Sequence, residues 1–356
     1  MPRPSLCIKV PKTSGEKTIE LATKLGLIDK SLIIQRKEDN LFIPLVREPE
    51  GLELASLESK IPKFSILTSV FSEKRLPPEN LFQALQDKLP SNLLNIVPQA
   101  FDIIGDIVVI DIPPQLKPYQ NVIGDAIMQT QKNVSTVLGK ASDISGIFRV
   151  RNYDFIAGER KTRTIHHEFG CQYHVDISKA YFSPRLSHEH SRVAFQVQDN
   201  EIIVDLFAGV GPFSVLIAKR NPTVKVYAID LNPDAVELLK ANVKANKVEN
   251  QVFPTVADAK EIALIALHAV ADRVIMNLPE TAIDFVDAAC STIKSKGGMI
   301  HFYGFVRSPD TIENLKMRFS KLVEKSGRRV EEFTYSRSIR ETAPFESQIV
   351  LDAKIA

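Results

Sequence analysis

The chain of 356 residues contains few cysteines, and their number and positions exclude two kinds of protein. Cys7, Cys171 and Cys290 are odd in number and far apart. Such a scattered set fits neither a disulfide framework nor a zinc site. It indicates a reducing compartment, and we expect a cytoplasmic protein.

Long apolar runs are also absent from the sequence. No uncharged stretch is long enough to span a bilayer. The first ten residues, MPRPSLCIKV, lack the apolar block of a signal peptide. We therefore expect no membrane association. The hydrophobic content of 44% and the charged content of 25% are those of an ordinary globular protein with two or three domains.

The net charge of +2 is too small for a protein that binds nucleic acid through a generally basic surface. Basic residues are nevertheless concentrated in two segments. Residues 147–192 contain eight Arg and Lys against five Asp and Glu, and residues 307–340 contain nine against five. A positive stripe of this kind can hold phosphates, although ordinary solvated surface can have the same composition.

The order of the expected elements divides the chain into three domains. Residues 1–65 read as a small α+β domain with a strand, a helix between Ser14 and Gly26, and two short strands. Within it, the charged and proline-containing segment 47–65 is predicted to be a linker. Residues 66–195 are predicted to form a middle α+β domain.

In the middle domain we expect one strand within residues 102–113 and a long helix from Gln120 to Leu138. Two further strands are expected within residues 146–158 and 171–183.

Residues 196–356 alternate strand and helix. This alternation predicts an α/β fold, in which a mostly parallel sheet is covered by helices on both faces. Near the C-terminus, residues 331–338 and 346–355 alternate like an antiparallel pair of strands.

A glycine-containing turn follows the first strand of this last domain. In VDLFAGVGPFS, Asp205 ends the strand, and Gly209 and Gly211 let the backbone approach a ligand closely. Open α/β sheets bind ligands at this end of their strands. Ser214 replaces the third glycine of a GxGxxG phosphate loop, and an acid precedes the turn. Both features favour a cationic ligand without a phosphate, such as S-adenosylmethionine.

Polar residues also follow the next three strands. Asp230, in YAIDLNP, can accept hydrogen bonds from ribose hydroxyls, and Asp258 is placed to meet an adenine amino group. Asn277, in VIMNLPE, offers a donor and an acceptor to the edge of a planar base, on a turn that Pro279 rigidifies. Capping of a helix that begins near Thr281 is the alternative role for Asn277.

The sequences VDLFAGVGPFS, AIDLNPDAV and NLP resemble the class I S-adenosylmethionine-dependent methyltransferases. KAYFSPRLSHE, with DLFAGVGPFS after it, is similar specifically to the archaeal–eukaryal tRNA (guanine-37-N1)-methyltransferase family. The likeness extends from about residue 100 to residue 355. It implies an N-terminal domain (1–65) that recognises the tRNA elbow, a middle domain (66–195), and a Rossmann-type catalytic domain (196–356).

The resemblance also implies roles for individual residues. Glu189, in SPRLSHE, corresponds to the general base, and Arg149 to an arginine that assists it. Tyr181 and Arg185 match substrate-binding positions, and Asn277 matches the contact to the target base. From the residues alone, an arginine such as Arg149 in a basic, strand-rich block is more often a surface or phosphate contact, and a plain ion pair is the alternative for Glu189.

These residue types suit methylation of guanine. N1 of guanine carries a proton, which a carboxylate of raised pKa can remove. A guanidinium can then stabilise the negative charge that grows on O6. By the same resemblance, Phe207 and Leu231 line the donor site. The predicted reaction transfers a methyl group from S-adenosylmethionine to N1 of a flipped-out guanosine 37 in the anticodon loop of tRNA, by a monomeric enzyme.

The sequence departs from the family pattern after Asn277. Leu278 stands where many members have proline, and Glu280 stands where an aromatic residue often stacks on the base. We expect Tyr303 or Phe305, after the fifth strand, to stack on the base instead. An NLP-type motif is also found in relatives that act on a tricyclic wyosine precursor, so methylation of that precursor at the same nucleotide is an alternative.

Other functions share parts of this pattern. A transferase of the aminocarboxypropyl group to wyosine intermediates would add a different mass to tRNA. An RNA-binding protein with a vestigial donor fold would show no heat of binding with S-adenosylmethionine. A dehydrogenase would reveal itself by reduced nicotinamide fluorescence, but the ordered set DxFxGxG, DxNP and a later Asp favours a methyltransferase. His188 and His190 lack a third ligand nearby, and we expect no metal site.

Overall fold

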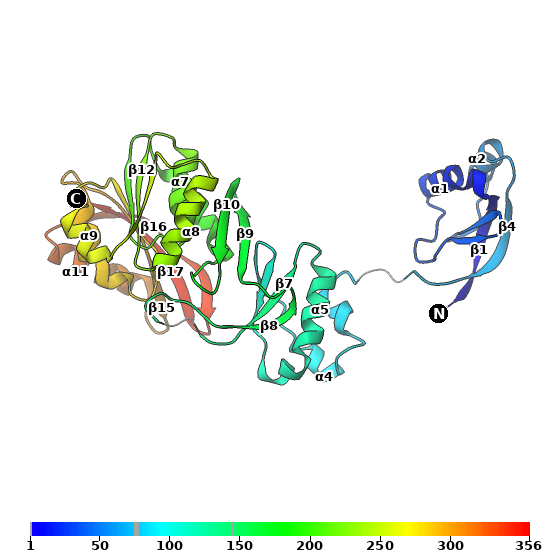
Figure 1. Ribbon diagram of the computed structural model, residues 1–356, viewed down its shortest axis with the longest axis horizontal. Helices are drawn as coiled ribbons and strands as arrows, with labels where there is room; N and C mark the ends of the chain where they lie inside the picture. Colours follow the sequence, from blue (N-terminus) through cyan, green and yellow to red (C-terminus); the bar gives the residue numbers. More distant parts are fainter. Residues whose placement is uncertain (1, 75–77, 144–145) are drawn as a thin grey trace. The chain divides into compact units, whose positions relative to one another are not determined.

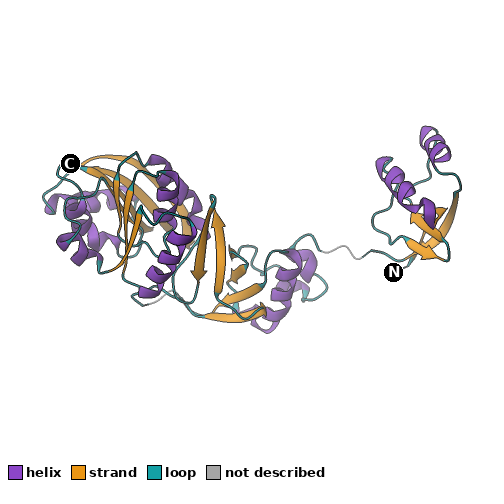
Figure 2. Ribbon diagram, turned by 45° about the horizontal axis from the view of Figure 1, so that its top comes forward, coloured by secondary structure: helices purple, strands orange, loops and turns teal. Residues whose placement is uncertain are grey.

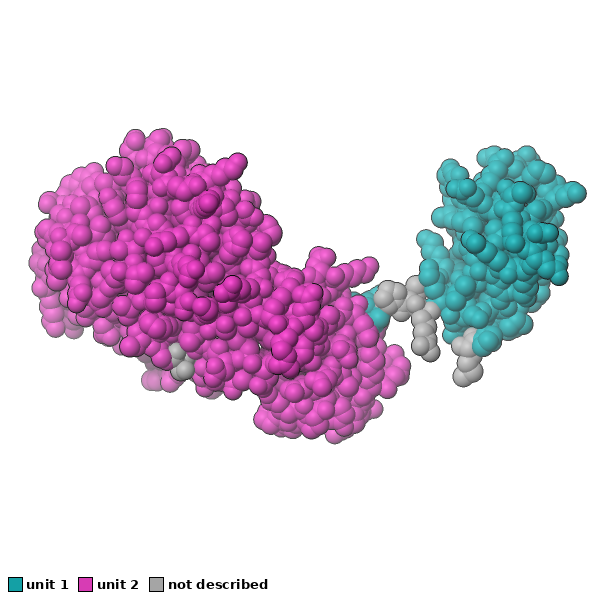
Figure 3. Space-filling model, in the orientation of Figure 1, with its two compact units in different colours: residues 1–79 teal, residues 80–356 magenta. Residues whose placement is uncertain are grey.

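A computed structural model of the chain describes residues 2–74, 78–143 and 146–356. By its internal contacts, the chain divides into two compact units, Met1–Glu79 and Asn80–Ala356, which are coloured teal and magenta in Figure 3.

The first unit is a small α+β domain. Its elements are β1 (Arg3–Pro11), the 3₁₀ turn η1 (Lys12–Ser14), α1 (Gly15–Lys24), β2 (Gln35–Lys37), β3 (Asn40–Pro44), α2 (Leu52–Lys60) and β4 (Ser65–Phe71). The strands form an antiparallel sheet in the order β2-β3-β1-β4. Ile8, Val10 and Ile43 are buried between this sheet and the helices.

The predicted linker at residues 47–65 is wrong. Residues Leu52–Lys60 form the helix α2, whose Leu57 is fully buried in the core of the unit. β4 then pairs along β1, so that the compact unit continues beyond residue 65 to Glu79. Burial of one apolar face stabilised a helix in a segment whose composition is that of a loop.

The second unit begins with a mixed sheet. Its elements are α3 (Leu81–Leu85), α4 (Ser91–Leu94), β5 (Asp102–Ile104), β6 (Ile107–Ile110), η2 (Pro114–Tyr119), α5 (Gln120–Thr130), β7 (Thr136–Lys140) and β8 (Tyr153–Gly158). The strand order is β5-β6-β7-β8, and α5 packs on the sheet through Ile123 and Ile127.

Two predictions for this region are corrected. The single strand expected at 102–113 is a hairpin, because Gly105 adopts a φ of 57° and turns the chain between β5 and β6. The helix expected from Gln120 to Leu138 ends at Thr130, because residues 136–140 pair in parallel with β6. This pairing is a long-range contact that helical periodicity does not reveal.

A two-stranded ribbon and a helix precede the large sheet. They comprise β9 (Arg163–Glu168), which was not predicted, β10 (Cys171–Asp176), η3 (Pro184–Leu186) and α6 (Ser187–Gln196). Asn242, in the helix that runs beside β10, and Asn246, the residue that follows this helix, accept hydrogen bonds from backbone N–H groups of β10 at 2.6 and 3.0 Å. These side chains fix the ribbon to the part of the unit that contains the large sheet.

The remaining strands form the predicted parallel sheet. They are β11 (Ile202–Asp205), β12 (Lys225–Asp230), β13 (Val252–Val256), β14 (Arg273–Met276), β15 (Gly298–Arg307), β16 (Val330–Ala343) and β17 (Glu346–Ile355). The order is β13-β12-β11-β14-β15-β17-β16, with the first five strands parallel. β17 is antiparallel to both β15 and β16. The α/β fold class and the antiparallel C-terminal pair are therefore confirmed.

Helices cover both faces of this sheet (Figures 1 and 2). They are α7 (Pro212–Arg220), α8 (Pro233–Ala245), α9 (Ala259–Ile265), η4 (Ala282–Phe285), α10 (Val286–Thr292) and α11 (Ile312–Lys325). α6, α7 and α8 share one core with the sheet, and α9, α10 and α11 share the other. Successive residues of a strand pack into opposite cores: Ile203 lies in the first core and Val204 in the second.

No helix in the described parts of the chain combines the length and the apolar composition that crossing a bilayer requires.

Candidate active site

The predicted ligand-binding residues lie at one edge of the sheet. Asp205 and Asp230 are the last residues of β11 and β12, and Asn277 directly follows β14. Asp258 follows β13 by two residues. The chain leaves β11 for β12 on one side and later returns to place β14 on the other, so this edge has the switch point at which open α/β sheets bind ligands.

The glycine turn closes against the neighbouring strand. The backbone N–H of Gly209 donates to Asp230 Oδ2 at 2.7 Å, which ties the turn after β11 to the end of β12. Gly211 precedes α7 with a φ of 88°, and a Cβ there would lie 2.2 Å from Leu239 Cδ1. Only glycine meets both conditions without strain.

We expect Gly211→Ala to lower the free energy of unfolding by about 1–3 kcal/mol, because the added methyl group enters a packed core in an unfavourable backbone conformation. Urea unfolding measures the loss. Gly327→Ala is the matched control, since Gly327 also has a positive φ, 79°, but a Cβ added there would meet no atom within 4 Å. Equal losses in the two variants would contradict a role for close packing on Leu239.

Asp205 has a buried oxygen with no partner. Its Oδ2 accepts a hydrogen bond from Ser214 Oγ at 2.7 Å, whereas Oδ1 is buried and bonded to no described residue. Burial raises the pKa of this carboxyl to about 7, against the lowering effects of the Ser214 hydrogen bond and of the Phe207 backbone N–H, which lies too far or too poorly aligned to satisfy Oδ1. An unsatisfied buried acceptor costs about 1–3 kcal/mol, so a ligand that donates to Oδ1 would be stabilised.

Asp230 and Asp258 are held differently. Burial raises the pKa of Asp230, while backbone N–H groups, among them that of Asn232, donate to it. Asp258 caps α9 through Oδ1, at 2.8 Å from the N–H of Lys260, and its other oxygen makes no hydrogen bond to a described residue.

Two apolar residues complete the surroundings of these acids. Phe207 packs edge-on against Phe285, with ring centroids 5.0 Å apart. Leu231, after Asp230, is 43% exposed and offers an open apolar surface at the sheet edge.

After Asp205, Asn277 carries the second buried acceptor without a hydrogen-bond partner at this edge. Its Oδ1 is buried and has no hydrogen-bond partner among the described residues. The capping alternative is wrong, because Thr281 precedes η4 and no side chain caps that turn. Pro279 is partly buried in the same loop. The asparagine therefore presents a free carbonyl oxygen at the carboxyl end of β14.

Glu189 is buried and anchored through one oxygen. It is 3% exposed, and its Oε2 accepts from Arg192 Nε at 3.0 Å and from the hydroxyl of Tyr303 at 3.1 Å. Oε1 accepts no hydrogen bond from a described residue and is not fully enclosed. The carboxylate is thus held in a defined orientation with one oxygen left to accept a proton.

Tyr303 connects Glu189 with the sheet edge. It follows Phe302, the residue of β15 that pairs with Met276 just before Asn277. Its ring centroid is 5.7 Å from that of Phe213, in the first turn of α7. The expectation that Tyr303 stacks on a base is wrong, because the side chain is fully buried inside β15. Phe305 also belongs to β15 and does not follow it.

A buried charge network behind Glu189 was not predicted. Arg192 donates hydrogen bonds from both terminal nitrogens to the carboxylate of Asp352. His301 Nδ1 is also hydrogen-bonded to this carboxylate, at 2.7 Å from Oδ1. The charges and hydrogen bonds of His301 and Arg192 hold the pKa of Asp352 well below its usual range, although burial acts in the opposite direction. His301 Nε2 lies 2.7 Å from Arg273 Nη1. No local motif marks these residues, which come from α6, β14, β15 and β17.

Arg149 is joined to the loop that carries Asn277. Its two terminal nitrogens form a bidentate ion pair with Glu280, in which Nη2 lies 2.7 Å from Oε1. The guanidinium lowers the pKa of the Glu280 carboxyl through this hydrogen bond. The glutamate that departs from the family pattern therefore contacts the predicted O6-binding arginine.

The other predicted substrate residues lie close to these elements. Tyr181 is 38% exposed, and its backbone oxygen lies 3.9 Å from the position of a Cβ on Gly209. Its hydroxyl accepts from Arg340 Nη2 at 3.4 Å. Arg185 is paired with Asp102 in β5, so its guanidinium is already engaged by the middle part of the unit.

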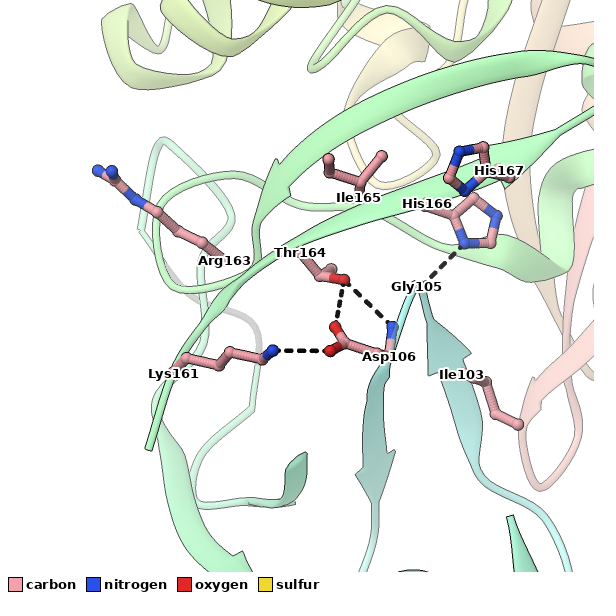
Figure 4. Close-up of a pocket in the computed structure, with 9 residues that line it drawn as sticks. All are labelled: Ile103, Gly105, Asp106, Lys161, Arg163, Thr164, Ile165, His166 and His167. Atoms are coloured by element: carbon pink, nitrogen blue, oxygen red, sulfur yellow. Dashed lines mark hydrogen bonds and ion pairs between the residues drawn. The ribbon is translucent and has the colours of Figure 1, made fainter. Parts of the chain in front are cut away.

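A groove of about 580 Å³ lies away from this edge, beside β9 (Figure 4). Lys161 and Thr164 point at Asp106 (Figure 4). Lys161 Nζ lies 2.6 Å from Asp106 Oδ2, and Thr164 Oγ1 lies 2.7 Å from Asp106 Oδ1. Arg163 points away from that cluster, with its exposed side chain paired to Asp176. The groove includes none of the residues of the sheet edge, so it is distinct from the predicted donor site.

His190, one of the two histidines considered as metal ligands, bonds through Nδ1 to Glu168 Oε1 at 2.7 Å. Among the described residues, no group of three or more His, Cys, Asp or Glu is arranged to hold a metal ion.

Three family domains match successive parts of the chain. The TRM5/TYW2 methyltransferase domain matches residues 164–331, and the TYW2 N-terminal domain matches residues 81–162. The tRNA methyltransferase 5 N-terminal domain matches residues 7–53.

Similar proteins share most or all of this length. The chain is 39% identical over 352 residues to tRNA (guanine(37)-N(1))-methyltransferase Trm5b of Pyrococcus abyssi, a match that covers 99% of each chain. It is 36% identical over 254 residues to tRNA 4-demethylwyosine(37)-methyltransferase Taw21 of Saccharolobus solfataricus, a match that covers 71% of this chain and 92% of the relative.

Solved structures agree with the sequence matches. Trm5b of Pyrococcus abyssi superimposes with a TM-score of 0.71 at 37% identity, covering 99% of each chain. The structure of aTrm5 in complex with tRNALeu gives a TM-score of 0.74 at 32% identity, covering 99% of this chain and 100% of the other. The chain therefore belongs to the TRM5/TYW2 family, and within it to the tRNA (guanine-37-N1)-methyltransferases that its sequence resembles.

Proposed function

We propose that the protein transfers a methyl group from S-adenosylmethionine to N1 of guanosine 37 in tRNA. The full-length similarity to Trm5b of Pyrococcus abyssi supports this reaction. The observation that carries the proposal for this chain is the state of Glu189, a buried carboxylate with Oε2 anchored and Oε1 free.

The residues at the sheet edge fit the methyl donor. The unpartnered Oδ1 of Asp205 is an acceptor for a cationic amino group, and Asp230 offers acceptors for ribose hydroxyls. The free oxygen of Asp258 suits the adenine amino group, while Phe207 and Leu231 supply apolar contacts. The sulfonium of the bound donor supplies an activated methyl group, which needs positioning more than further activation.

Glu189 acts as the general base in this proposal. Its Oε1 takes the proton from N1 of guanine, and Arg192 and Tyr303 keep the carboxylate in place during the transfer. Arg149 donates to O6, where negative charge develops, and Asn277 holds the edge of the base through its free carboxamide oxygen. Tyr181 and Arg185 contact the nucleotide from the adjoining segment.

We further propose that the first unit, residues 1–79, recognises the tRNA elbow and residues 80–195 contact the anticodon stem, while residues 196–356 bind the donor. Exposed Arg163 and His167 beside the groove are suited to phosphate contacts. A monomer suffices, because one chain supplies both the base and the donor-binding residues. Buried, free cysteines fit action in the reducing cytoplasm.

A second candidate reaction is modification of a tricyclic wyosine precursor at the same nucleotide. The similarity to Taw21, a 4-demethylwyosine methyltransferase, favours it. The chain is also 33% identical over 251 residues to a tRNA(Phe) (4-demethylwyosine(37)-C(7)) aminocarboxypropyltransferase of Methanocaldococcus jannaschii. Methyl and aminocarboxypropyl products differ in mass.

Incubation with tRNA transcripts that carry guanosine, adenosine or inosine at position 37, followed by nucleoside mass spectrometry, tests the proposal. We expect 1-methylguanosine from the first transcript, no product from adenosine, and methylation of inosine, which keeps N1–H and O6. A precursor tRNA with 4-demethylwyosine tests the second reaction. Failure to form 1-methylguanosine would overturn the main proposal.

We expect the affinity for S-adenosylmethionine to rise with pH between about pH 5.5 and 7. The pKa of Asp205 is about 7 in the free protein, so the carboxyl is protonated below that pH, whereas a cationic ligand favours the carboxylate. Binding should therefore release up to one proton, and affinity should fall by up to about tenfold per pH unit below 7. Calorimetry across this range checks the slope, which Asp205→Asn should abolish.

A further inference from the structure

Glu280 and Arg149 are 131 positions apart in the sequence and form a two-point ion pair. The Arg149 side chain is 21% exposed and that of Glu280 is 52% exposed, so the pair lies at the border between protein and solvent. A bidentate carboxylate fixes the plane of a guanidinium as well as its position. The contact therefore orients Arg149 and does more than neutralise its charge.

The pairing leaves donors on Arg149. Glu280 engages Nη1 and Nη2 once each, and the guanidinium has five N–H groups in all. Nε makes no hydrogen bond with a described residue. Arg149 can thus keep its bond to Glu280 and still donate to the oxygen of a base.

The backbone of Arg149 needs such support. Its φ is 54°, a left-handed conformation that side chains other than glycine adopt at a cost of about 1–2 kcal/mol. Among the described residues, its N–H donates to the backbone at Gly146 O alone, at 3.1 Å and within the same short turn. In the described residues, the Glu280 carboxylate is the sole ion-pair partner of the guanidinium. The described contact that holds the Arg149 side chain to a distant part of the chain is therefore its ion pair with the loop that also carries Asn277.

We propose that Glu280 is a positioning residue for the methyl transfer. It holds the Arg149 guanidinium beside the base-binding loop, so that the donor to O6 and the amide of Asn277 keep a fixed separation. This inference rests on the proposed function and deepens it. Glu280 itself contacts neither the base nor the methyl donor.

Single-turnover kinetics on a tRNA transcript with guanosine 37 test this role. We expect Glu280→Gln and Glu280→Ala to lower the rate of methyl transfer by about tenfold, with less than about a threefold change in KM for tRNA. S-adenosylmethionine affinity, measured by calorimetry, should remain unchanged and shows that the variants fold. Glu331→Gln is the matched control, because Glu331 forms a comparable exposed ion pair with Lys354, between β16 and β17.

A double-mutant cycle separates positioning from other effects. If Glu280 acts through Arg149, the variant Arg149→Ala/Glu280→Ala should be no slower than Arg149→Ala alone. Additive losses, or an unchanged or faster rate in Glu280→Ala, would overturn the inference. If the unaltered protein forms no 1-methylguanosine, the proposed function fails, whereas normal product with an insensitive Glu280 overturns the positioning role alone.

Discussion

Replacing Glu189 with glutamine should lower the rate of 1-methylguanosine formation by about 10²–10⁴-fold, the usual contribution of a positioned general base. Glutamine keeps the size of the side chain and can still accept from Arg192 and Tyr303, but it cannot take the proton from N1. S-adenosylmethionine affinity should change little, because Glu189 approaches the sheet edge from α6 and is not one of the acids that end the strands. Single-turnover kinetics and calorimetry measure the two quantities.

Glu168→Gln provides the control for this result. Glu168 is also buried, at 7% exposure, and bonds to His190, the neighbour of Glu189 in α6. Its loss disturbs the same helix without removing the proposed base, so we expect less than about a tenfold decrease in rate. Equal losses of rate and donor affinity in Glu189→Gln, or an equal rate loss in Glu168→Gln, would show that Glu189 has a structural role.

Replacing Asp352 with alanine should lower the free energy of unfolding by about 3–5 kcal/mol, since breaking a buried, hydrogen-bonded ion pair by removing one partner is strongly destabilising. Asp352 is 0% exposed and joins Arg192 to His301, so the substitution would take this acceptor from His301 Nδ1 and from both terminal nitrogens of Arg192, whose one remaining ion pair among the described residues would be that with Glu189. Urea unfolding followed by circular dichroism measures the loss. Glu331→Ala, which removes an exposed ion pair with Lys354, should leave the free energy of unfolding nearly unchanged.

The contribution of Asp352 to the free energy of unfolding should depend on pH in a definite direction. The folded-state pKa of Asp352 is depressed, so its contribution is fully present above the unfolded pKa of about 4 and is lost as the pH falls toward the folded value. The stability difference between wild type and Asp352→Ala should therefore be constant near neutral pH and shrink below about pH 4. A difference that grew on acidification would contradict the ionised state of Asp352.

Local sequence patterns were sufficient to predict much of the secondary structure of the catalytic domain. Alternation of apolar strands and helices predicted β11, α7, β12 and α8 and the parallel sheet, because each element buries a face that its own residues define. The acids at strand ends were predicted to lie together for the same reason, since parallel strands in one sheet present their carboxyl ends at one edge.

Predictions failed where distant contacts decide the local structure. Residues 52–60 have the composition of a linker, yet burial of Leu57 against the first sheet makes them helical. Residues 136–140 continue an apolar pattern that suits a helix, yet their backbone pairs with β6. In both segments, the tertiary contact outweighs a weak local preference.

The fold class, the glycine turn after Asp205 and the polar residues that follow successive strands could be predicted from the sequence, because they depend on neighbours within a few positions. The way the reactive groups are held depends on contacts between distant parts of the chain. Glu189 and Tyr303 are 114 positions apart, and Arg192 and Asp352 are 160 apart. Such partners are chosen by packing: a charge removed from water must find its counter-charge wherever the fold brings one within reach, and no local pattern records that distance.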